Sequence, residues 1–378
     1  MKKTLAAAVI ISACSLFAQQ SEIAKWDPAM AQQNAVISNG VKWIDGKCLP
    51  IEGRAFPDVE HYYDRLPANV STNVNAGVRG MKHHTSGMMF RFKTNSKQLS
   101  FKWTPWKKSL AMDHMASTGV SGIDIYRYDE KKGRWLYVKT GRIWNAETGG
   151  TLTIKWAPNT ACLVNLPLYN GVSTFTLGID PEATVEALPP RKSGINKPVV
   201  FYGTSITHGG CCTRPGLAFV NRVGRELDVP VVGLGFSGSG VMELEMSEHL
   251  ARIDASCYVL DCLWNMGVTE KQRPGRSVEG NYEKFIRNLR AKRPNTPIIM
   301  AEQCDVYMNG PNEKDIFIRA LYEKLVAEGW SNLIFLPKTE MYTGDFEGTV
   351  DGCHPNDLGM ESLAKAFGKA VKAALHLQ

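Results

Sequence analysis

The sequence has no long apolar run after its first twenty residues, and nothing beyond them reaches the length of a transmembrane helix. Lysine and arginine residues are not clustered in the sequence. The net charge is +7, or +5 without Lys2 and Lys3, and the basic residues are scattered. A nucleic-acid-binding surface needs a concentrated basic patch, so nucleic acid is not an expected partner. The nine cysteines fall at no zinc-ligand spacing. No metal and no other cofactor is expected.

The first residues, MKKTLAAAVIISACSLFAQQ, are typical of a secretory signal peptide. Lysines precede a short apolar run, and small residues follow up to Ala18, after which we expect cleavage. The predicted location is therefore periplasmic or secreted. The stretch ISAC, ending at Cys14, also resembles a bacterial lipoprotein box, which makes an outer-membrane lipoprotein the second alternative. Disulfide pairing among the eight remaining cysteines cannot be derived from their spacing.

Between about residues 34 and 180, apolar residues alternate with polar ones over short runs. Leu99, Phe101 and Trp103 lie on one face of LSFKW, with Ser100 and Lys102 on the other. Similar runs occur at 90–93, 123–127, 134–139, 152–156, 161–168 and 172–179, separated by turn residues. Short strands at such spacing predict an antiparallel, jelly-roll-like β-sandwich.

After a Pro/Gly/Lys linker at 187–198, the pattern changes to alternating strands and helices. Strands are expected at 198–202, 230–234, 257–261, 297–301 and 332–336, and helices at 216–227, 242–252, 280–293, 313–329 and 358–375. This order predicts a three-layer α/β/α domain with a five-stranded parallel sheet. The chain thus divides into a signal peptide (1–18), a β-sandwich domain (19–188) and an α/β domain (189–378).

Ligands of parallel sheets bind at the carboxyl ends of the strands, and polar residues stand there in this sequence. Ser205 follows the first strand in YGTSITHGG, and Gly238 follows the second in GLGFSGSG. Asn265 follows the third in LDCLWNMG, while Asp351 and His354 share one loop before the last helix, in DGCHPNDLG.

These residue types are the parts that acyl transfer needs. A serine hydroxyl becomes nucleophilic when an imidazole takes its proton, and a carboxylate fixes the tautomer of that imidazole. A backbone N–H in a glycine turn and an asparagine amide can both stabilise an oxyanion. The α/β-hydrolase elbow G-x-S-x-G is not matched, because Thr207 stands where that motif has its second glycine.

The motifs GTSIT, GFSGSG, LWNM and DxxHP resemble those of the SGNH (GDSL-like) hydrolases, in the order that this family shows. The first half resembles the β-sandwich of a bacterial two-domain branch, whose Gly-x-Asp-Leu-Tyr motif appears here as SGIDIY at 121–126. The resemblance implies Ser205 as nucleophile, His354 as base and Asp351 as its orienting acid. It also implies an oxyanion hole made by the N–H groups of Ser205 and Gly238 and the amide of Asn265.

Two positions of the nucleophile motif need separate mention. Thr204 stands where the family more often has Asp. His208, three residues after Ser205, is the other histidine that could act as base, but we interpret it as structural because its side chain begins the same helix. Asp124 and Tyr126 of GIDIY are interpreted as packing residues.

Two further residues are candidates for substrate contact. Arg214 follows the nucleophile turn on a rim loop, although a structural arginine explains the pattern equally well. His114 lies in MDHMASTGVSG at 112–122, which we expect to be a long loop that exposes Met112, His114 and Met115 and walls one side of the Ser205 cleft.

The sequence thus predicts an exported serine esterase that acts on a short acyl ester, with an O-acetyl group on a carbohydrate as the expected case. The prediction of a carbohydrate substrate depends on the family resemblance and on export, not on any pocket residue. The alternatives are a catalytically reduced glycan-binding protein, and an arylesterase or thioesterase acting on a non-carbohydrate ester. The expected partner is a small-molecule or glycan ester, and the oligomeric state is not predicted.

Overall fold

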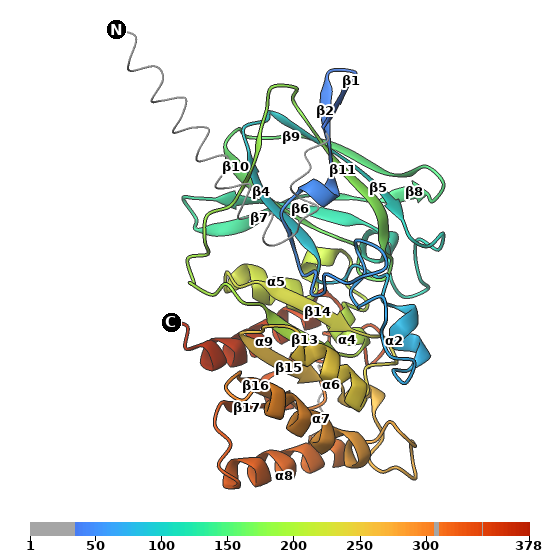
Figure 1. Ribbon diagram of the computed structural model, residues 1–378, viewed down its shortest axis with the longest axis vertical. Coiled ribbons are helices and arrows are strands. Elements are labelled where there is room, and N and C mark those ends of the chain that lie inside the picture. Colours follow the sequence, from blue (N-terminus) through green and yellow to red (C-terminus); the bar gives the residue numbers. More distant parts are fainter. Residues whose placement is uncertain (1–34, 306–309, 342) are drawn as a thin grey trace.

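The computed structural model describes residues 35–305, 310–341 and 343–378. The predicted signal peptide, with Cys14, lies outside the described residues. Figure 1 shows antiparallel strands in one half of the molecule and a parallel sheet with its helices in the other. No helix of the described ranges has the length and apolar character of a membrane span.

The first half, called the sandwich below, consists of two antiparallel sheets that enclose one apolar core. One sheet has the strand order β1-β2-β11-β5-β9-β8, and the other has β12-β4-β10-β6-β7 with β3 beside β4. Leu99, Phe101 and Trp103 are buried and Lys102 is exposed, as predicted for LSFKW, but Ser100 is also buried, where its hydroxyl bonds that of Thr153 at 2.9 Å. The elements are β1 (Val36–Ser38), β2 (Val41–Asp45), β3 (Ile51–Glu52), α2 (Ala76–Gly80), β4 (Met89–Thr94), β5 (Gln98–Pro105), α3 (Ser117–Val120), β6 (Ile123–Asp129), β7 (Arg134–Gly141), β8 (Ile143–Asn145), β9 (Gly149–Lys155), β10 (Thr160–Asn165), β11 (Val172–Ile179) and β12 (Val185–Ala187).

The second half, called the α/β domain, has a five-stranded sheet in the order β14-β13-β15-β16-β17, and all of its pairs are parallel. The predicted fold class is confirmed. The strand order reverses between β13 and β15, which is where ligands bind in sheets of this kind. The elements are β13 (Val199–Gly203), α4 (Ser205–His208), α5 (Phe219–Glu226), β14 (Val231–Gly235), α6 (Leu244–Ala251), β15 (Cys257–Asp261), α7 (Val278–Lys292), β16 (Ile298–Ala301), α8 (Glu313–Ala327), β17 (Leu333–Leu336) and α9 (Asp357–Leu375).

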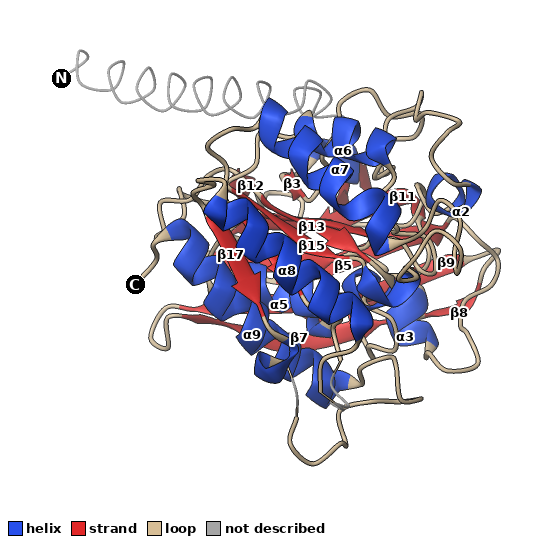
Figure 2. Ribbon diagram, turned by 90° about the horizontal axis from the view of Figure 1, so that it is seen from below, coloured by secondary structure: helices blue, strands red, loops and turns tan. Residues whose placement is uncertain are grey.

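Helices cover both faces of the parallel sheet, as Figure 2 shows, and successive residues of its strands face opposite sides. On β13, Val199 and Phe201 belong to the cluster under α5 and α9. Val200 and Tyr202 belong to the cluster under α6 and α7. A strand buried on both faces reads as an unbroken apolar run, and this is why KPVVFY carries no alternation in the sequence.

Both of these clusters continue into the first half of the chain. Phe56 and Leu66, from the segment between β3 and β4, pack into the α6–α7 cluster. Met115 and Leu168 pack into the α5–α9 cluster. The division near residue 188 therefore separates the sheets along the sequence, and the sandwich keeps a core of its own, but the two clusters of the α/β domain extend across the division.

Candidate active site

Ser205 is the first residue of α4 and follows β13 after a single connecting residue. A side chain at Gly203 would place its Cβ 2.1 Å from the Thr207 hydroxyl and 2.5 Å from the Asp261 carbonyl oxygen, so the turn can close only with glycine here. Thr204 caps α4, because its hydroxyl accepts a hydrogen bond from the N–H of Ile206. A threonine can thus replace the more usual aspartate without loss of the cap.

Ser205, His354 and Asp351 form a continuous hydrogen-bonded chain. The Ser205 Oγ lies 2.9 Å from His354 Nε2, and His354 Nδ1 lies 2.7 Å from Asp351 Oδ2. When Nδ1 carries a proton and donates it in a hydrogen bond to the carboxylate, Nε2 is left free to accept the serine proton. Ser205 is 7% exposed, so its hydroxyl is mostly shielded from solvent and lies next to the imidazole.

The Asp351 carboxylate also folds the loop that carries His354. Its Oδ1 accepts from the N–H groups of Cys353 and His354, at 3.0 and 2.7 Å. Partial burial raises the pKa of Asp351, but these two bonds and the one from the His354 ring outweigh burial and lower the pKa to about 2. The carboxylate therefore stays ionised wherever the imidazole needs it.

The glycine turn after β14 lies directly against the nucleophile turn. The N–H of Phe236 donates to the Gly203 carbonyl at 2.9 Å, and a Cβ at Gly240 would meet that carbonyl oxygen at 2.1 Å. Gly238 has a φ of +64°, which favours glycine. Its N–H makes no hydrogen bond within the described ranges and is therefore available as a donor.

Asn265 lies in the turn after β15 and is 7% exposed. Its Nδ2 donates to the carbonyls of Phe236 and Gly240, each at a long 3.3 Å, so the amide sits against the same glycine turn. Arg273 fixes the backbone of this turn, because its Nη1 donates to the Asn265 carbonyl at 2.7 Å. Bonds of this length are weak enough to be exchanged for a bond to substrate.

Leu263 and Met266, which flank the asparagine in LWNM, point away from this site. Both are buried in the α6–α7 cluster, at 0% and 3% exposure. These two side chains therefore contribute to the core and not to the walls of the acyl pocket.

Tyr169, from the sandwich, supports α4, which begins at Ser205, and was missed by sequence reasoning. Its hydroxyl donates to the Ser205 carbonyl at 3.0 Å, and its ring stacks on that of His208 with 4.1 Å between centroids. It follows β10 in a run, LPLYN, that carries no catalytic pattern. No signal in the sequence could have singled it out.

A buried cluster of cationic and imidazole groups lies behind α4. His84 Nδ1 is 3.1 Å from His208 Nε2, and the Arg65 guanidinium donates to the carbonyls of Gly233 and Gly235. Burial, with a further contribution from Arg65, lowers the pKa of both imidazoles well below the usual value, so both rings are neutral. His208 is thus a structural residue, as its position in the sequence indicated.

The loop at 112–122 reaches His354. The His114 ring lies 5.7 Å from the His354 ring, centroid to centroid, and the Thr118 hydroxyl donates to the Thr213 carbonyl. The expected exposure of the two methionines was wrong: Met115 is 3% exposed and Met112 is half-buried. Met115 packs into the α5–α9 cluster because the loop folds inward as α3 and is held against the α/β domain.

Arg214 does not lie among the catalytic groups. Its Nη1 donates to Asp124 Oδ2 at 2.8 Å and to the Tyr126 hydroxyl, and its guanidinium lies over the Tyr137 ring. The guanidinium is occupied by an ion pair between the two halves of the chain, so we correct its assignment from substrate contact to a structural link. Asp124 and Tyr126 are packing residues, as expected, and are also the partners of this link.

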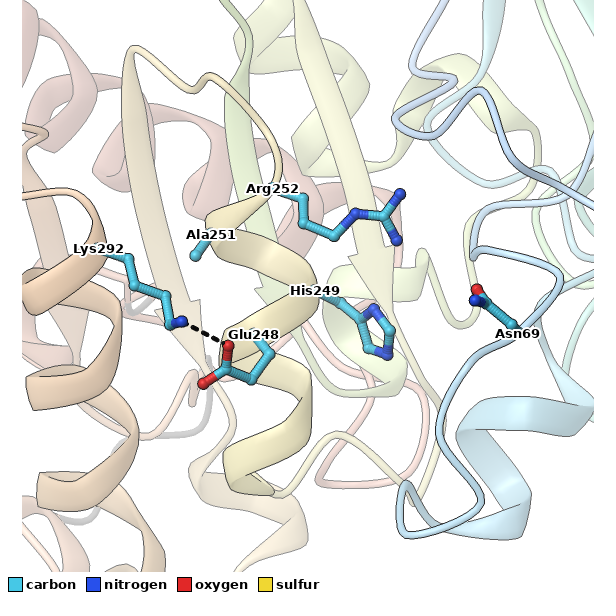
Figure 3. A pocket seen from close by; sticks show the side chains of 6 residues that line it. All are labelled: Asn69, Glu248, His249, Ala251, Arg252 and Lys292. Atoms are coloured by element: carbon cyan, nitrogen blue, oxygen red, sulfur yellow. Dashed lines mark ion pairs between the residues drawn. The ribbon is translucent and has the colours of Figure 1, made fainter.

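Outside this region, a hollow of about 310 Å³ lies on the surface at α6 (Figure 3). Its lining contains the ion pair of Glu248 with Lys292, at 2.7 Å, and His249. None of the lining residues forms a nucleophile–base pair, so the hollow does not compete as a catalytic site. Within the described part of the chain, no three His, Cys, Asp or Glu residues are grouped as metal ligands.

Comparison with protein families extends this picture to both halves. Residues 196–372 match the GDSL-like lipase/acylhydrolase family, and residues 41–185 match the N-terminal domain of SGNH-hydrolase-type esterases. The chain is a two-domain SGNH (GDSL-like) ester hydrolase. The sandwich is accordingly a GxDLY domain, with SGIDIY as its motif.

Solved structures of similar architecture include three that cover most of the chain. A GDSL-like lipase from Bacteroides ovatus ATCC 8483 is 27% identical over 89% of this chain and 99% of its own, with a TM-score of 0.76. The salicylyl-acyltransferase of a tetracycline biosynthetic pathway is 17% identical over 89% and 98%, with a TM-score of 0.70. A family two carbohydrate esterase from Cellvibrio japonicus is 11% identical over 91% and 98%, with a TM-score of 0.56. No curated protein matches the sequence.

Proposed function

We propose that this protein is an exported serine esterase that removes short acyl groups, O-acetyl above all, from carbohydrates. The observation that carries the proposal is the hydrogen-bonded chain from Ser205 through His354 to Asp351, with heavy-atom distances of 2.9 and 2.7 Å. A nucleophile, a base and an orienting acid at these distances form a competent triad.

In the proposed reaction, Ser205 Oγ attacks the ester carbonyl while its proton moves to His354 Nε2. His354 then gives this proton to the leaving alcohol oxygen, and an acyl-serine remains. Water, deprotonated by the same imidazole, attacks the acyl-serine and releases the carboxylic acid and the free serine. The negative charge in both tetrahedral intermediates would be held by the N–H groups of Ser205 and Gly238 and by the Asn265 amide.

The short acyl length is supported by the crowding around His354. His114 covers one side of its ring. On another side, a Cβ at Gly210 would already come within 3.2 Å of His354 Cδ2 and 3.0 Å of the Tyr169 hydroxyl. The carbohydrate is supported by structural neighbours described as family two carbohydrate esterases, one of them solved with cellohexaose.

Two alternatives remain for the test. A glycan-binding protein that has lost activity would lack a member of the triad, whereas all three side chains are present and hydrogen-bonded here. An arylesterase or thioesterase would use the same machinery on a different leaving group, so only a comparison of substrates separates it from the proposal.

The test compares substrates and one pair of variants. We expect p-nitrophenyl acetate to be hydrolysed faster than the butyrate, the octanoate to be poor, and acetate to be released from acetylated xylan or mannan. Ser205→Ala should lower the rate by about 10⁴-fold or more, because the triad acts as a unit. Ser239→Ala, on the neighbouring glycine turn, is the matched control and should keep the rate. A thioester preferred over all oxygen esters, or no acetate from any polysaccharide, would contradict the carbohydrate assignment.

A further inference from the structure

A second cleft, of about 1020 Å³, lies between the two halves of the chain. It is lined by β6 and β7, by the linker at 192–193, by α5 and by the C-terminal end of α9. In Figure 1, β7 lies beside α5 on the side where the chain ends. Its volume is at the upper end of the range for sites that bind small organic molecules.

The cleft is separate from the triad. None of Ser205, Asp351 and His354 lines it. The start of α9 is near the loop of Asp351 and His354, because Asp357 is the third residue after His354. Lys372, which lines the cleft, comes fifteen residues later on the same helix, and a rise of about 1.5 Å per residue places it roughly 22 Å further along.

The carboxylates that line the cleft are already neutralised. Glu226 pairs with Arg222 at 3.2 Å, and Asp228 pairs with Arg191 at 2.9 Å. Lys372 bonds the terminal residue Gln378. No negative charge of the lining is therefore left over to balance a further cation.

Besides Lys372, three cations of the lining form no ion pair within the described ranges: Arg134 on β7, Lys192 on the linker and Arg225 on α5. Arg225 lies over the Tyr126 ring, with 4.3 Å from its guanidinium carbon to the centroid. The Lys192 Nζ lies 5.5 Å from the Tyr128 ring centroid and bonds its hydroxyl at 3.4 Å. Cations that are held by rings in this way lose little conformational freedom when an anion binds.

We propose that this cleft is an accessory binding site for an acidic oligosaccharide, one whose sugar units carry carboxylates. The three unpaired cations come from three separate segments that line the same cleft, and a chain of uronate units presents several carboxylates to match them. Trp135 and the tyrosines supply apolar surface for the faces of the sugar rings. The site would hold an acidic polymer on the enzyme while the triad acts elsewhere on its esters.

Binding is tested by calorimetry on the full chain with the Ser205→Ala substitution, with de-esterified tetragalacturonate as the probe. This measurement requires no ester hydrolysis, so it succeeds or fails independently of the proposed function. We expect saturable binding that weakens as salt is raised from about 50 to 200 mM, because charge pairing dominates. Cellotetraose, neutral and of the same length, should bind at least tenfold more weakly.

Variants locate the site. Arg225→Gln and Lys192→Gln should each weaken tetragalacturonate binding several-fold, and together by tenfold or more. Lys155→Gln is the matched control, because Lys155 is exposed, like Lys192, but lies on β9 of the other sheet. The same substitutions are also made in the protein that keeps Ser205, and its hydrolysis of p-nitrophenyl acetate shows that the variants fold correctly. If Arg225→Gln fails to fold, Arg134→Gln replaces it, because Arg134 is exposed, and it should weaken tetragalacturonate binding in the same way.

Three results would overturn the proposal. The first is equal binding of cellotetraose, which would remove the role of charge. The second is undiminished binding by the double variant, which would place the ligand elsewhere. The third is binding of inorganic phosphate or of an oligothymidylate as tight as that of tetragalacturonate, which would assign the cleft to phosphate or to nucleic acid.

Discussion

Arg214 of the α/β domain and Asp124 of the sandwich form an ion pair, with Nη1 2.8 Å from Oδ2 and the carboxylate side chain fully buried. The same carboxylate accepts from the N–H of Gly216 at 2.8 Å and from the Asn165 amide at 2.7 Å. The aspartate of the GIDIY motif thus anchors the segment that directly follows the nucleophile helix. It links the GxDLY domain to the active site without touching the triad.

Arg214→Ala should destabilise the protein strongly. It leaves the Asp124 carboxylate buried without its cation, and breaking a buried pair in this way costs on the order of 3 kcal/mol. Thermal unfolding should show a midpoint lower by several degrees. Lys365→Ala is the control: it removes an exposed pair with Glu361 on α9 and should change stability by less than about 0.5 kcal/mol. Equal effects of the two substitutions would contradict the anchoring role.

Asn265→Ala should lower kcat by roughly 10²- to 10³-fold and leave KM nearly unchanged, which is the loss expected for one oxyanion donor. Because its amide bonds only two carbonyls at long distance, the fold should survive. Steady-state kinetics on p-nitrophenyl acetate checks both constants. A rise in KM at constant kcat would instead assign Asn265 to binding of the ground-state substrate.

His114→Ala should change which acyl chains the enzyme accepts. The ring lies beside that of His354 from a loop of the sandwich, so its removal leaves more space next to His354. We expect the ratio of butyrate to acetate hydrolysis to rise by several-fold while the acetate rate changes little. Asp113→Ala, on the neighbouring exposed position, is the control. If the ratio stays constant in both variants, His114 does not limit acyl length.

Asp261 should make the protein less stable as pH rises. Burial raises the pKa of this carboxyl, which bonds the Thr207 hydroxyl, from 3.8 to about 7. Between these pH values the folded state holds a proton that the unfolded state has released, so stability falls from about pH 4 to about pH 7 and stays low above. Asp261→Asn cannot ionise, and its melting temperature should gain on wild type more at pH 8 than at pH 5. An equal difference at both pH values would contradict the shift.

The sequence predicted the parts of this molecule that follow from local pattern. The five parallel strands could be predicted because a strand that is buried on both faces is an unbroken apolar run. The D-x-x-H loop could be predicted because its two residues are only three positions apart. Tyr169, Arg65 and the buried Met115 were not readable, since each depends on a surface brought from the other half of the chain. Arg214 was placed on the correct rim loop, but its partner Asp124 lies ninety residues away, and no local pattern connects them.

The central claim, that Ser205 is the nucleophile, is tested most directly by covalent trapping. A p-nitrophenyl alkylphosphonate transfers its phosphonyl group to an activated serine and releases p-nitrophenolate. Peptide mass spectrometry should find one adduct, on the peptide that contains Ser205, together with loss of esterase activity in proportion to labelling. Ser205→Ala should take up no label. An adduct on another residue, or full labelling of Ser205→Ala, would contradict the account.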